Sequence, residues 1–186
     1  KPNIAPVVFA QLEKAYGNKP TPEQILYYCY AILYSNIFRE KYAEFLKIDF
    51  PRIPFTSDYN LFLQMAGLGE ELGQLHLLKG KVFNKPVAKF RGNGDNLIEK
   101  PVFEADKKCL YINKTQYFEG ITQQIWEYHI GGYQVLKKYL DSRKGRILGH
   151  DDDYFKIITA IYETINIQTQ IDTIFNKVEI KTISDQ

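Results

Sequence analysis

The stretch Trp126-Glu127-Tyr128-His129-Ile130-Gly131-Gly132-Tyr133-Gln134-Val135-Leu136-Lys137-Lys138-Tyr139-Leu140, which runs on to Arg143-Lys144-Gly145-Arg146, decides how the chain is interpreted. It predicts an aromatic-rich strand over residues 123–130, a glycine turn, a short basic helix and a cationic turn. Glycine lacks a Cβ and tolerates positive φ, so the double glycine lets the backbone approach another molecule closely. We expect Gly132, Tyr133 and Gln134 to begin the helix, where unpaired N–H groups favour an anion such as phosphate.

Basic residues gather in two parts of the sequence, although the net charge of the 186 residues is only +2. One part is the basic helix with its turn, and the other is residues 79–91, which contain no acidic residue. Such clusters contact nucleic-acid phosphates, and they also occur on the solvated faces of ordinary proteins. The residues that we predict to contact phosphates are Lys137, Lys138, Arg143, Lys144, Arg146, Lys89 and Arg91.

Side chains able to pair with base edges lie next to the basic residues. Amide and carboxylate groups donate to or accept from the edges of bases in the major groove, and tyrosine combines a stacking ring with a hydroxyl. Each of these residues alone is better explained as part of an ordinary polar surface, and the group together is as consistent with base reading as with such a surface. As a group they form the predicted base-reading set, which is Gln123, Gln124, Glu127, Tyr133 and Gln134.

Two amphipathic helices are predicted in the first part of the chain. Thr21-Pro22-Glu23-Gln24 combines a capping threonine, a proline at the first helical position and a glutamine three residues after the cap. We expect this helix to continue to about Lys47, before Pro51 and Pro54 enforce an extended segment. A second helix starts near Ser57 or Asp58 and packs against the first as an antiparallel pair.

Short strands are predicted after residue 80. Residues 86–91 and 97–103 flank Gly92-Asn93-Gly94-Asp95, which suits a hairpin turn, and residues 109–113 form a third strand. Asp151-Asp152-Asp153 then precedes a long helix, where carboxylates favour the N-terminus.

The expected fold class is α+β: an N-terminal antiparallel helical pair, a small and mostly antiparallel sheet, and C-terminal helices. We divide one compact fragment into a helical segment, 1–79, and a sheet-plus-helix part, 80–186.

Common catalytic and membrane signals are missing from the sequence. It has no P-loop, no G-x-S-x-G and no G-x-G-x-x-G, and its three histidines are too far apart for metal-ligand spacing. Cys29 and Cys109 form no disulfide framework and are expected to be free thiols in a reducing compartment. No apolar run approaches the length of a membrane span and no signal peptide is visible, so we expect a cytoplasmic location.

Two alternatives to nucleic-acid recognition stay open. Asp95 with Asp106-Lys107-Lys108 matches a loose acidic-x-Lys pattern, and a small Mg²⁺-dependent nuclease would use Asp95, Asp106 and Lys108. The chain is also unusually aromatic, with 14 Tyr and 12 Phe, which suits a protein-interaction module.

Several stretches resemble one protein family. Phe50-Pro51-Arg52-Ile53-Pro54, which follows Tyr42-Ala43-Glu44-Phe45-Leu46, and then Leu75-His76-Leu77-Leu78 look like the segment after the methyltransferase domain of large single-chain restriction-modification enzymes. The residues from Trp126 to Leu136 and from Arg143 to Arg146 are similar to a pattern in the C-terminal specificity domain of type ISP enzymes. The resemblance covers residues 21–175, and it departs from the family at Tyr139, where a tryptophan is expected.

The resemblance implies a target recognition domain that binds double-stranded DNA. Such a domain reads the sequence for a covalently attached N-terminal adenine methyltransferase and a nuclease-translocase. Residues 1–79 would dock to that methyltransferase. The resemblance implies no cofactor for this chain, and S-adenosylmethionine, Mg²⁺ and ATP for the absent domains. The first residue, Lys1, is not a methionine, which agrees with a fragment of a longer protein.

Overall fold

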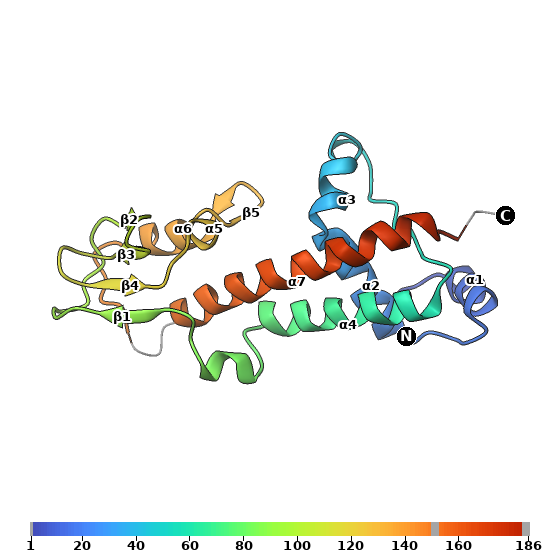
Figure 1. Cartoon of the computed structure of the whole chain (residues 1–186), viewed down its shortest axis with the longest axis horizontal. Helices are drawn as coiled ribbons and strands as arrows, with labels where there is room; N and C mark the ends of the chain where they lie inside the picture. Colours follow the sequence, from blue (N-terminus) through green and yellow to red (C-terminus); the bar gives the residue numbers. More distant parts are fainter. Residues whose placement is uncertain (1, 150–152, 184–186) are drawn as a thin grey trace. The chain divides into compact units, whose positions relative to one another are not determined.

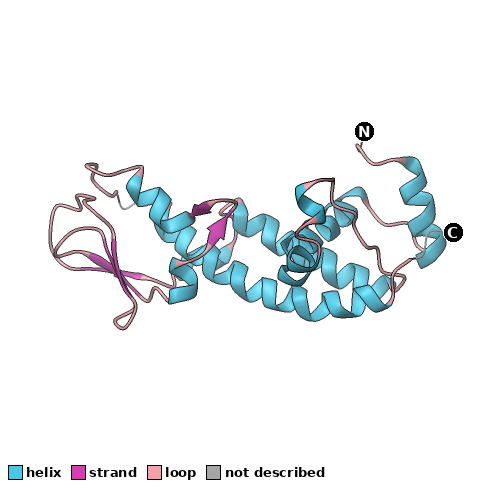
Figure 2. Cartoon of the chain, turned by 90° about the horizontal axis from the view of Figure 1, so that it is seen from above, coloured by secondary structure: helices cyan, strands magenta, loops and turns pink. Residues whose placement is uncertain are grey.

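The computed structural model describes residues 2–149 and 153–183, and it confirms the α+β fold class (Figures 1 and 2). The chain forms two compact units. The first, called the helical unit, consists of Lys1–Leu77 with Thr164–Gln186, and the second, called the sheet unit, is Leu78–Glu163. The long helix α7 (Tyr154–Ile180) contributes residues to both units.

The helical unit contains four further α-helices and a short 3₁₀ helix. Thr21 caps the second helix through a complete capping box with Gln24, as predicted, and Asp58 caps the fourth by accepting from the backbone N–H groups of Asn60 and Leu61. These five elements are α1 (Pro6–Tyr16), α2 (Pro22–Tyr34), α3 (Asn36–Lys41), the 3₁₀ helix η1 (Phe45–Lys47) and α4 (Tyr59–His76).

The predicted pairing of the first two long helices is confirmed, since α2 packs against α4 at very short range. A Cβ built on Gly69 would lie 1.9 Å from the backbone oxygen of Tyr27, so only glycine permits this approach. Beside this contact, Tyr28 stacks on Phe62 with ring centroids 5.0 Å apart, and neither side chain is exposed to solvent. Close backbone contact and aromatic burial therefore hold the helices together.

The prediction of one helix from Thr21 to about Lys47 is wrong, because the helix is interrupted at Ser35. Ser35 has an extended conformation, with φ −61° and ψ 126°, and its hydroxyl caps α3 by accepting from the N–H of Phe38 at 3.1 Å. The same hydroxyl donates to Asp172 of α7 at 2.7 Å, and the carboxylate also accepts from Asn36. A local N-cap and a partner 137 residues away thus stabilise this break together.

The sheet unit is built around four short antiparallel strands, in the order β1-β4-β3-β2. One row of paired residues crosses this sheet on a single face: Phe90, Phe118, Leu110 and Phe103. Phe155 of α7 packs edge-on against Phe118 at 5.0 Å, which covers that face. The bounds are η2 (Lys81–Asn84), β1 (Lys89–Arg91), β2 (Val102–Glu104), β3 (Cys109–Tyr111) and β4 (Tyr117–Glu119).

The hairpin predicted at Gly92-Asn93-Gly94-Asp95 is wrong, since β1 pairs with β4 rather than with β2. The loop packs instead on the chain just before β4, where a Cβ on Gly92 would lie 1.9 Å from the backbone oxygen of Thr115. The buried Gln116 accepts from the N–H of Asn96 at 2.8 Å and donates to its side-chain oxygen at 2.6 Å. Gln116 thereby provides hydrogen-bond partners for both the backbone and the side chain of Asn96, which no hairpin partner strand supplies.

The strand predicted over residues 123–130 is also wrong in most of its length. Thr122 accepts from the N–H of Ile125 at 3.3 Å and starts a helical turn, α5 (Gln123–Trp126). Only β5 (His129–Ile130) is extended, and it pairs with β6 (Tyr133–Gln134), the separate small hairpin in Figure 2. The predicted basic helix is present as α6 (Val135–Asp141), but Gly132, Tyr133 and Gln134 precede it.

Three further predictions concern capping, thiols and membrane spans. Asp151 and Asp152 lie outside the described residues, whereas Asp153 directly precedes α7 and its carboxylate pairs with Lys156 at 3.3 Å. Cys29 and Cys109 are free, and burial raises the pKa of the Cys29 thiol to about 11. Within residues 2–149 and 153–183, none of the helices has the length and apolar character that crossing a membrane requires.

Candidate nucleic-acid interface

The β5–β6 hairpin and α6 stand on a buried support within the sheet unit. Leu136 and Leu140 of α6 are fully buried, and the buried Tyr154 hydroxyl donates to the backbone oxygen of Leu136 at 3.3 Å. Burial raises the pKa of Tyr154 well above its usual value, so its hydroxyl keeps the proton that it donates. Trp126 stacks on Phe103 of β2 with centroids 5.4 Å apart, which fixes α5 on the sheet.

The cationic turn, residues 143–146, is held to the segment that follows the Gly92 loop. The N–H of Gly145 donates to the oxygen of Ile98 at 2.8 Å, and the N–H of Ile98 donates to the oxygen of Arg146 at 2.9 Å. Gly145 has φ +81°, a conformation that favours glycine. Because its backbone is fixed on both sides, the turn presents its side chains from a defined position.

The seven predicted phosphate contacts differ in their present partners. Lys137 pairs with Asp141 at 2.5 Å and Arg91 with Glu119 at 3.0 Å, each partner about half exposed. The guanidinium of Arg143 lies over the ring of Tyr139, 3.6 Å from its centroid. Five of the seven form no ion pair with a described residue: Lys89, Lys138, Arg143, Lys144 and Arg146.

Those cations form two groups. Lys137 and Lys138 on α6 lie a few residues before the cationic turn, in one continuous segment. Lys89 and Arg91 lie on the sheet face opposite the Phe90 row, beside Tyr117 and Glu119. The predicted phosphate contacts thus come from two segments of the sheet unit, the strand β1 and the stretch from α6 to the turn.

The predicted base-reading residues are split between exposed positions and structural ones. Gln124 and Tyr133 are exposed, and Gln123 donates to the carboxylate of Glu127, the residue that follows α5. Gln134 is half-buried, and its amide donates to the backbone oxygen of Trp126 at 2.6 Å. Gln134 therefore fixes the shape of the hairpin, whereas the other four face solvent.

The residues of the nuclease alternative lie in two loops of the sheet unit. Asp95 accepts from the N–H of Leu97 at 3.0 Å, and Asp106 and Lys108 lie in the turn between β2 and β3, where Lys108 has φ +52°. Over the described residues, no group of three or more His, Cys, Asp or Glu side chains could hold a metal ion together.

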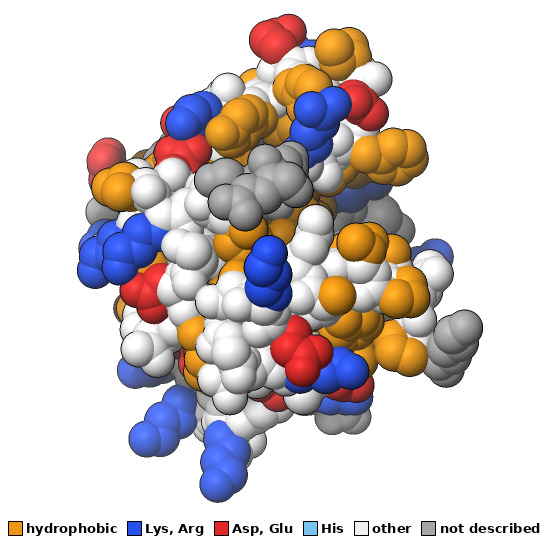
Figure 3. Space-filling model, turned by 90° about the vertical axis from the view of Figure 1, so that its right-hand side faces the viewer, with side chains coloured by type: hydrophobic (Ala, Val, Ile, Leu, Met, Phe, Trp, Pro, Cys, Tyr) orange, Lys and Arg blue, Asp and Glu red, His pale blue; other side chains and the backbone are white. Residues whose placement is uncertain are grey.

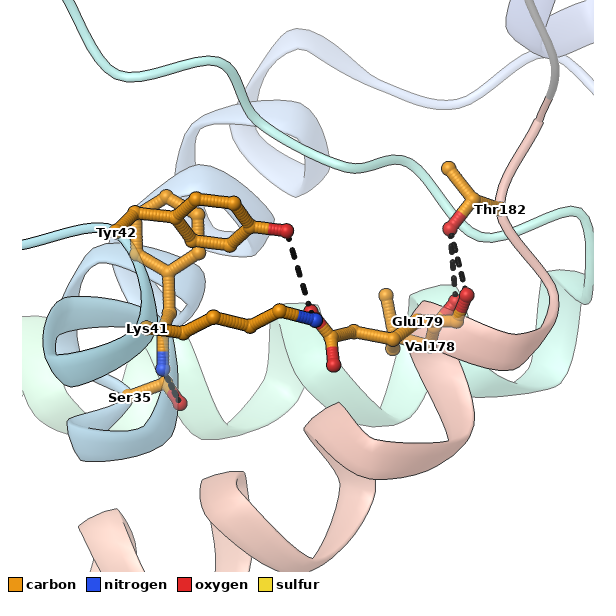
Figure 4. A network of polar contacts seen from close by, with 7 residues as sticks. Ser35, Lys41, Tyr42, Val178, Glu179 and Thr182 are labelled. Atoms are coloured by element: carbon orange, nitrogen blue, oxygen red, sulfur yellow. Dashed lines mark hydrogen bonds and ion pairs between the residues drawn. The ribbon is translucent and has the colours of Figure 1, made fainter. Parts of the chain in front are cut away.

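A second surface of different chemistry lies in the helical unit. A cavity of about 370 Å³ opens between α3, η1 and the proline-rich segment that follows. Figure 3 shows one face of the molecule, on which hydrophobic side chains are interspersed with charged ones. At one wall, Tyr42 and Lys41 both bond to Glu179 of α7, at 3.3 and 2.8 Å (Figure 4). The cavity is lined by Phe38, Tyr42, Phe45, Leu46, Arg52, Ile53 and Pro54.

Sequence reasoning did not identify this cavity or the exposed residues beside it. Ile48 and Phe50 are 83% and 88% exposed, although both are large and apolar. It also missed Ile130, which is 51% exposed at the hairpin tip. A signal was present in the apolar residues that flank the prolines and the double glycine, but the extended segment and the strand that were expected there do not predict which side chains are exposed.

An α+β scaffold with exposed cations and neighbouring amides is typical of a nucleic-acid-binding module. The family model for the type ISP C-terminal specificity domain matches residues 1–170. The chain therefore belongs to that family, and it is a target recognition domain of the restriction-modification class.

Solved structures of restriction-modification enzymes have a similar fold. A nuclease-deletion mutant of the type ISP enzyme LlaGI in complex with a DNA substrate mimic shares 20% identity, with TM-score 0.61, over 82% of this chain and 14% of that one. The DrdV–DNA complex shares 21% sequence identity with this chain and has a TM-score of 0.68. The match covers 92% of this chain and 20% of that one. LlaBIII, an ATP-dependent type ISP restriction-modification enzyme bound to DNA, shares 18% sequence identity and has a TM-score of 0.66. The match covers 90% of this chain and 12% of that one.

The present chain thus spans between one-eighth and one-fifth of the length of these enzymes. At such identities the similarity concerns the fold. A search of curated proteins gave no match.

Proposed function

We propose that the sheet unit reads a DNA sequence and positions the duplex for adenine methylation and cleavage by other domains of one enzyme. Those domains use S-adenosylmethionine, Mg²⁺ and ATP, and the whole enzyme works in the cytoplasm. The observation that carries the proposal is the cationic turn, whose fixed backbone presents Arg143, Lys144 and Arg146 without an ion pair to a described residue. Phosphate contacts of this kind set the register of a protein on DNA.

Base reading is assigned to the exposed face of α5 and to the hairpin. Gln123, Gln124 and Glu127 present amide and carboxylate groups, and Tyr133 adds an aromatic ring. Gln134 contributes by holding the hairpin through Trp126. Further phosphate contacts are assigned to Lys89, Arg91, Lys137 and Lys138. Arg91 and Lys137, which now pair with Glu119 and Asp141, would exchange these carboxylates for phosphates when DNA binds.

Binding to a duplex, followed by fluorescence anisotropy over a salt series, tests this assignment. Replacing Arg143, Lys144 and Arg146 together by glutamine removes three phosphate contacts, so the slope of log affinity against log salt falls by about 3. The matched control replaces Lys14, Lys19 and Lys177 of the helical unit, which changes the net charge equally and leaves the slope unchanged. An equal loss in both triple variants would contradict a specific role for the turn.

We propose that the helical unit docks to the methyltransferase domain through the apolar cavity. The chain spans only a small part of each matched enzyme, so the remaining domains of such an enzyme need a surface on which to rest. An apolar cavity flanked by the exposed Ile48 and Phe50 suits the burial of apolar side chains from a folded partner.

Association of the chain with the methyltransferase domain of the same enzyme, measured by calorimetry, tests the docking surface. Phe50→Ser should weaken association about tenfold or more, because Phe50 is 88% exposed and its loss does not disturb the core. Leu26→Ser, at a 61% exposed position on α2, serves as the control. Docking elsewhere would be indicated if Phe50→Ser bound as well as the unsubstituted chain.

A further inference from the structure

The tip of the β5–β6 hairpin exposes two large apolar side chains next to each other. Ile130 and Tyr133 are paired in register, so their side chains lie on the same face of the two-stranded ribbon. They are 51% and 63% exposed. The turn between them is Gly131-Gly132, Gly131 has φ +58°, and a Cβ on either glycine would meet no atom within 4 Å.

The base of the hairpin is fixed, in contrast to its open tip. Gln134 donates to the oxygen of Trp126 at 2.6 Å, and the N–H of Val135 donates to the oxygen of Tyr128 at 3.1 Å. Trp126 is stacked on Phe103 of the sheet. A thin tip on a rigid base enters a narrow space at a small cost in conformational entropy, because little of it has to be ordered on binding.

The charges around the tip favour a nucleic acid over an apolar protein surface. Lys138 places its ammonium 5.1 Å from the centroid of the Tyr133 ring, and Lys137 precedes it on α6. Residues 128–140 contain no Asp or Glu, and of the two flanking acids, Glu127 and Asp141, the second pairs with Lys137 and leaves Lys138 without a carboxylate partner among the described residues. A protein partner would have to desolvate these lysines, whereas a nucleic acid offers bases for the apolar pair and phosphates for the ammonium groups.

The other exposed apolar residues of the sheet unit lack this arrangement. Val102 is on the edge strand β2, Ile147 follows the cationic turn and Tyr162 is on α7, with exposures of 48%, 69% and 40%. None of them is described with an apolar cross-strand partner at a glycine turn. The pair at the hairpin tip therefore differs from scattered surface hydrophobics, which need no explanation.

We propose that the β5–β6 tip is an apolar wedge that enters the base stack of the bound duplex, with the Tyr133 ring against a base and Ile130 filling the adjacent space. Apolar side chains inserted at a base step unstack it and kink the duplex. Lys138 then moves from the tyrosine ring to a flanking phosphate. This inference rests on the proposed function, because it requires that the sheet unit binds DNA.

Fluorescence of 2-aminopurine, which rises when this base analogue is unstacked, tests the wedge. The full 186-residue chain is titrated into duplexes that carry 2-aminopurine at single positions, while anisotropy records binding separately. We expect a several-fold rise in fluorescence confined to one or two adjacent positions. Tyr133→Ala should abolish the rise and weaken binding about tenfold, the effect of losing one base–aromatic stack.

Three further variants separate the wedge from general binding. Tyr133→Phe should keep the rise, since the ring is retained, and Lys138→Gln should keep it while lowering the salt dependence. Tyr162→Ala removes another exposed tyrosine and should change neither signal. The wedge alone is overturned if the unsubstituted chain binds without a rise in 2-aminopurine fluorescence. It is also overturned if the fluorescence still rises when Tyr133→Ala binds. Absence of binding at low salt overturns the proposed function and the wedge together.

Discussion

The two units of this chain carry opposite charges and expose different chemistry. The sheet unit has 15 Lys and Arg and 11 Asp and Glu, which gives a formal charge of +4. The helical unit has 9 Lys and Arg and 11 Asp and Glu, which gives −2. The sheet unit exposes cations and amides around a hairpin, and the helical unit exposes an apolar cavity. A net charge of +2 for the whole chain conceals this difference. The proposed nucleic-acid surface and the proposed protein surface therefore belong to different units of the chain.

Gly69→Ala should have the largest effect, and it acts on the helical unit. A Cβ at this position would lie 1.9 Å from the backbone oxygen of Tyr27, so α2 and α4 must move apart. We expect a loss of about 3 kcal/mol or more in unfolding free energy, as for overpacked cores.

Gly67→Ala is the control for this prediction, because it lies in the same helix and its Cβ would meet no atom within 4 Å. It should stabilise the protein by about 0.5–1 kcal/mol through helix propensity. Chemical denaturation followed by circular dichroism measures both changes. Equal stabilities of the two variants would show that the close approach of α2 and α4 is not essential.

Gly92→Ala is the corresponding test of the sheet unit. Gly92 has φ +89°, and its added Cβ would lie 1.9 Å from the oxygen of Thr115, so strain and a backbone clash coincide. We expect a loss of about 2–3 kcal/mol and weaker DNA binding, because this loop leads to residues 96–98, which hold the cationic turn. Gly145→Ala has similar φ, +81°, but no clash, and it should lose only about 1 kcal/mol from backbone strain.

Thr21→Ala should weaken only the helical unit, and by less. The threonine accepts from the N–H of Gln24 at 3.2 Å, and its own N–H donates to the Gln24 side chain at 2.8 Å. Loss of this cap should cost about 1 kcal/mol in unfolding free energy and leave DNA affinity unchanged. Thr21→Ser keeps the hydroxyl and should restore most of the stability, so a similar loss in both variants would argue against capping.

The smallest effect should be a pH dependence of stability that arises in the helical unit from His76. Its Nδ1 lies 2.6 Å from the Tyr30 hydroxyl and its Nε2 lies 3.2 Å from the Thr164 hydroxyl. Burial lowers the pKa of His76, so the unfolded chain binds a proton more readily than the folded one.

The free energy of unfolding that the neutral His76 contributes is fully present above the pKa of the unfolded chain, about 6.5. It is lost as the pH falls from that value to the lower pKa of His76 in the folded protein. Denaturation midpoints at a series of pH values should therefore fall on acidification, and less steeply in His76→Gln. An unchanged slope in His76→Gln would assign the pH dependence to other groups.

The features that the sequence predicts correctly are those with local causes. The capping box at Thr21, the start of α4 at Asp58 and the basic helix α6 each follow from neighbouring residues. The failures involve distant partners, since Asp172 of α7 accepts from the Ser35 hydroxyl at the helix break and Gln116 binds Asn96 where a hairpin was predicted. At the candidate site, the basic turn was readable from composition, whereas the bond of Gln134 to Trp126 depends on a helical turn that propensity did not indicate.

Selection from a random-sequence duplex pool tests the central claim, which is that this chain reads DNA sequence. The purified chain is incubated with the pool across a salt series, and the retained DNA is sequenced. The account predicts that retention falls steeply with salt and that one short motif is enriched. Retained DNA as random as the starting pool would contradict it, because the sheet unit would then bind phosphates without reading bases.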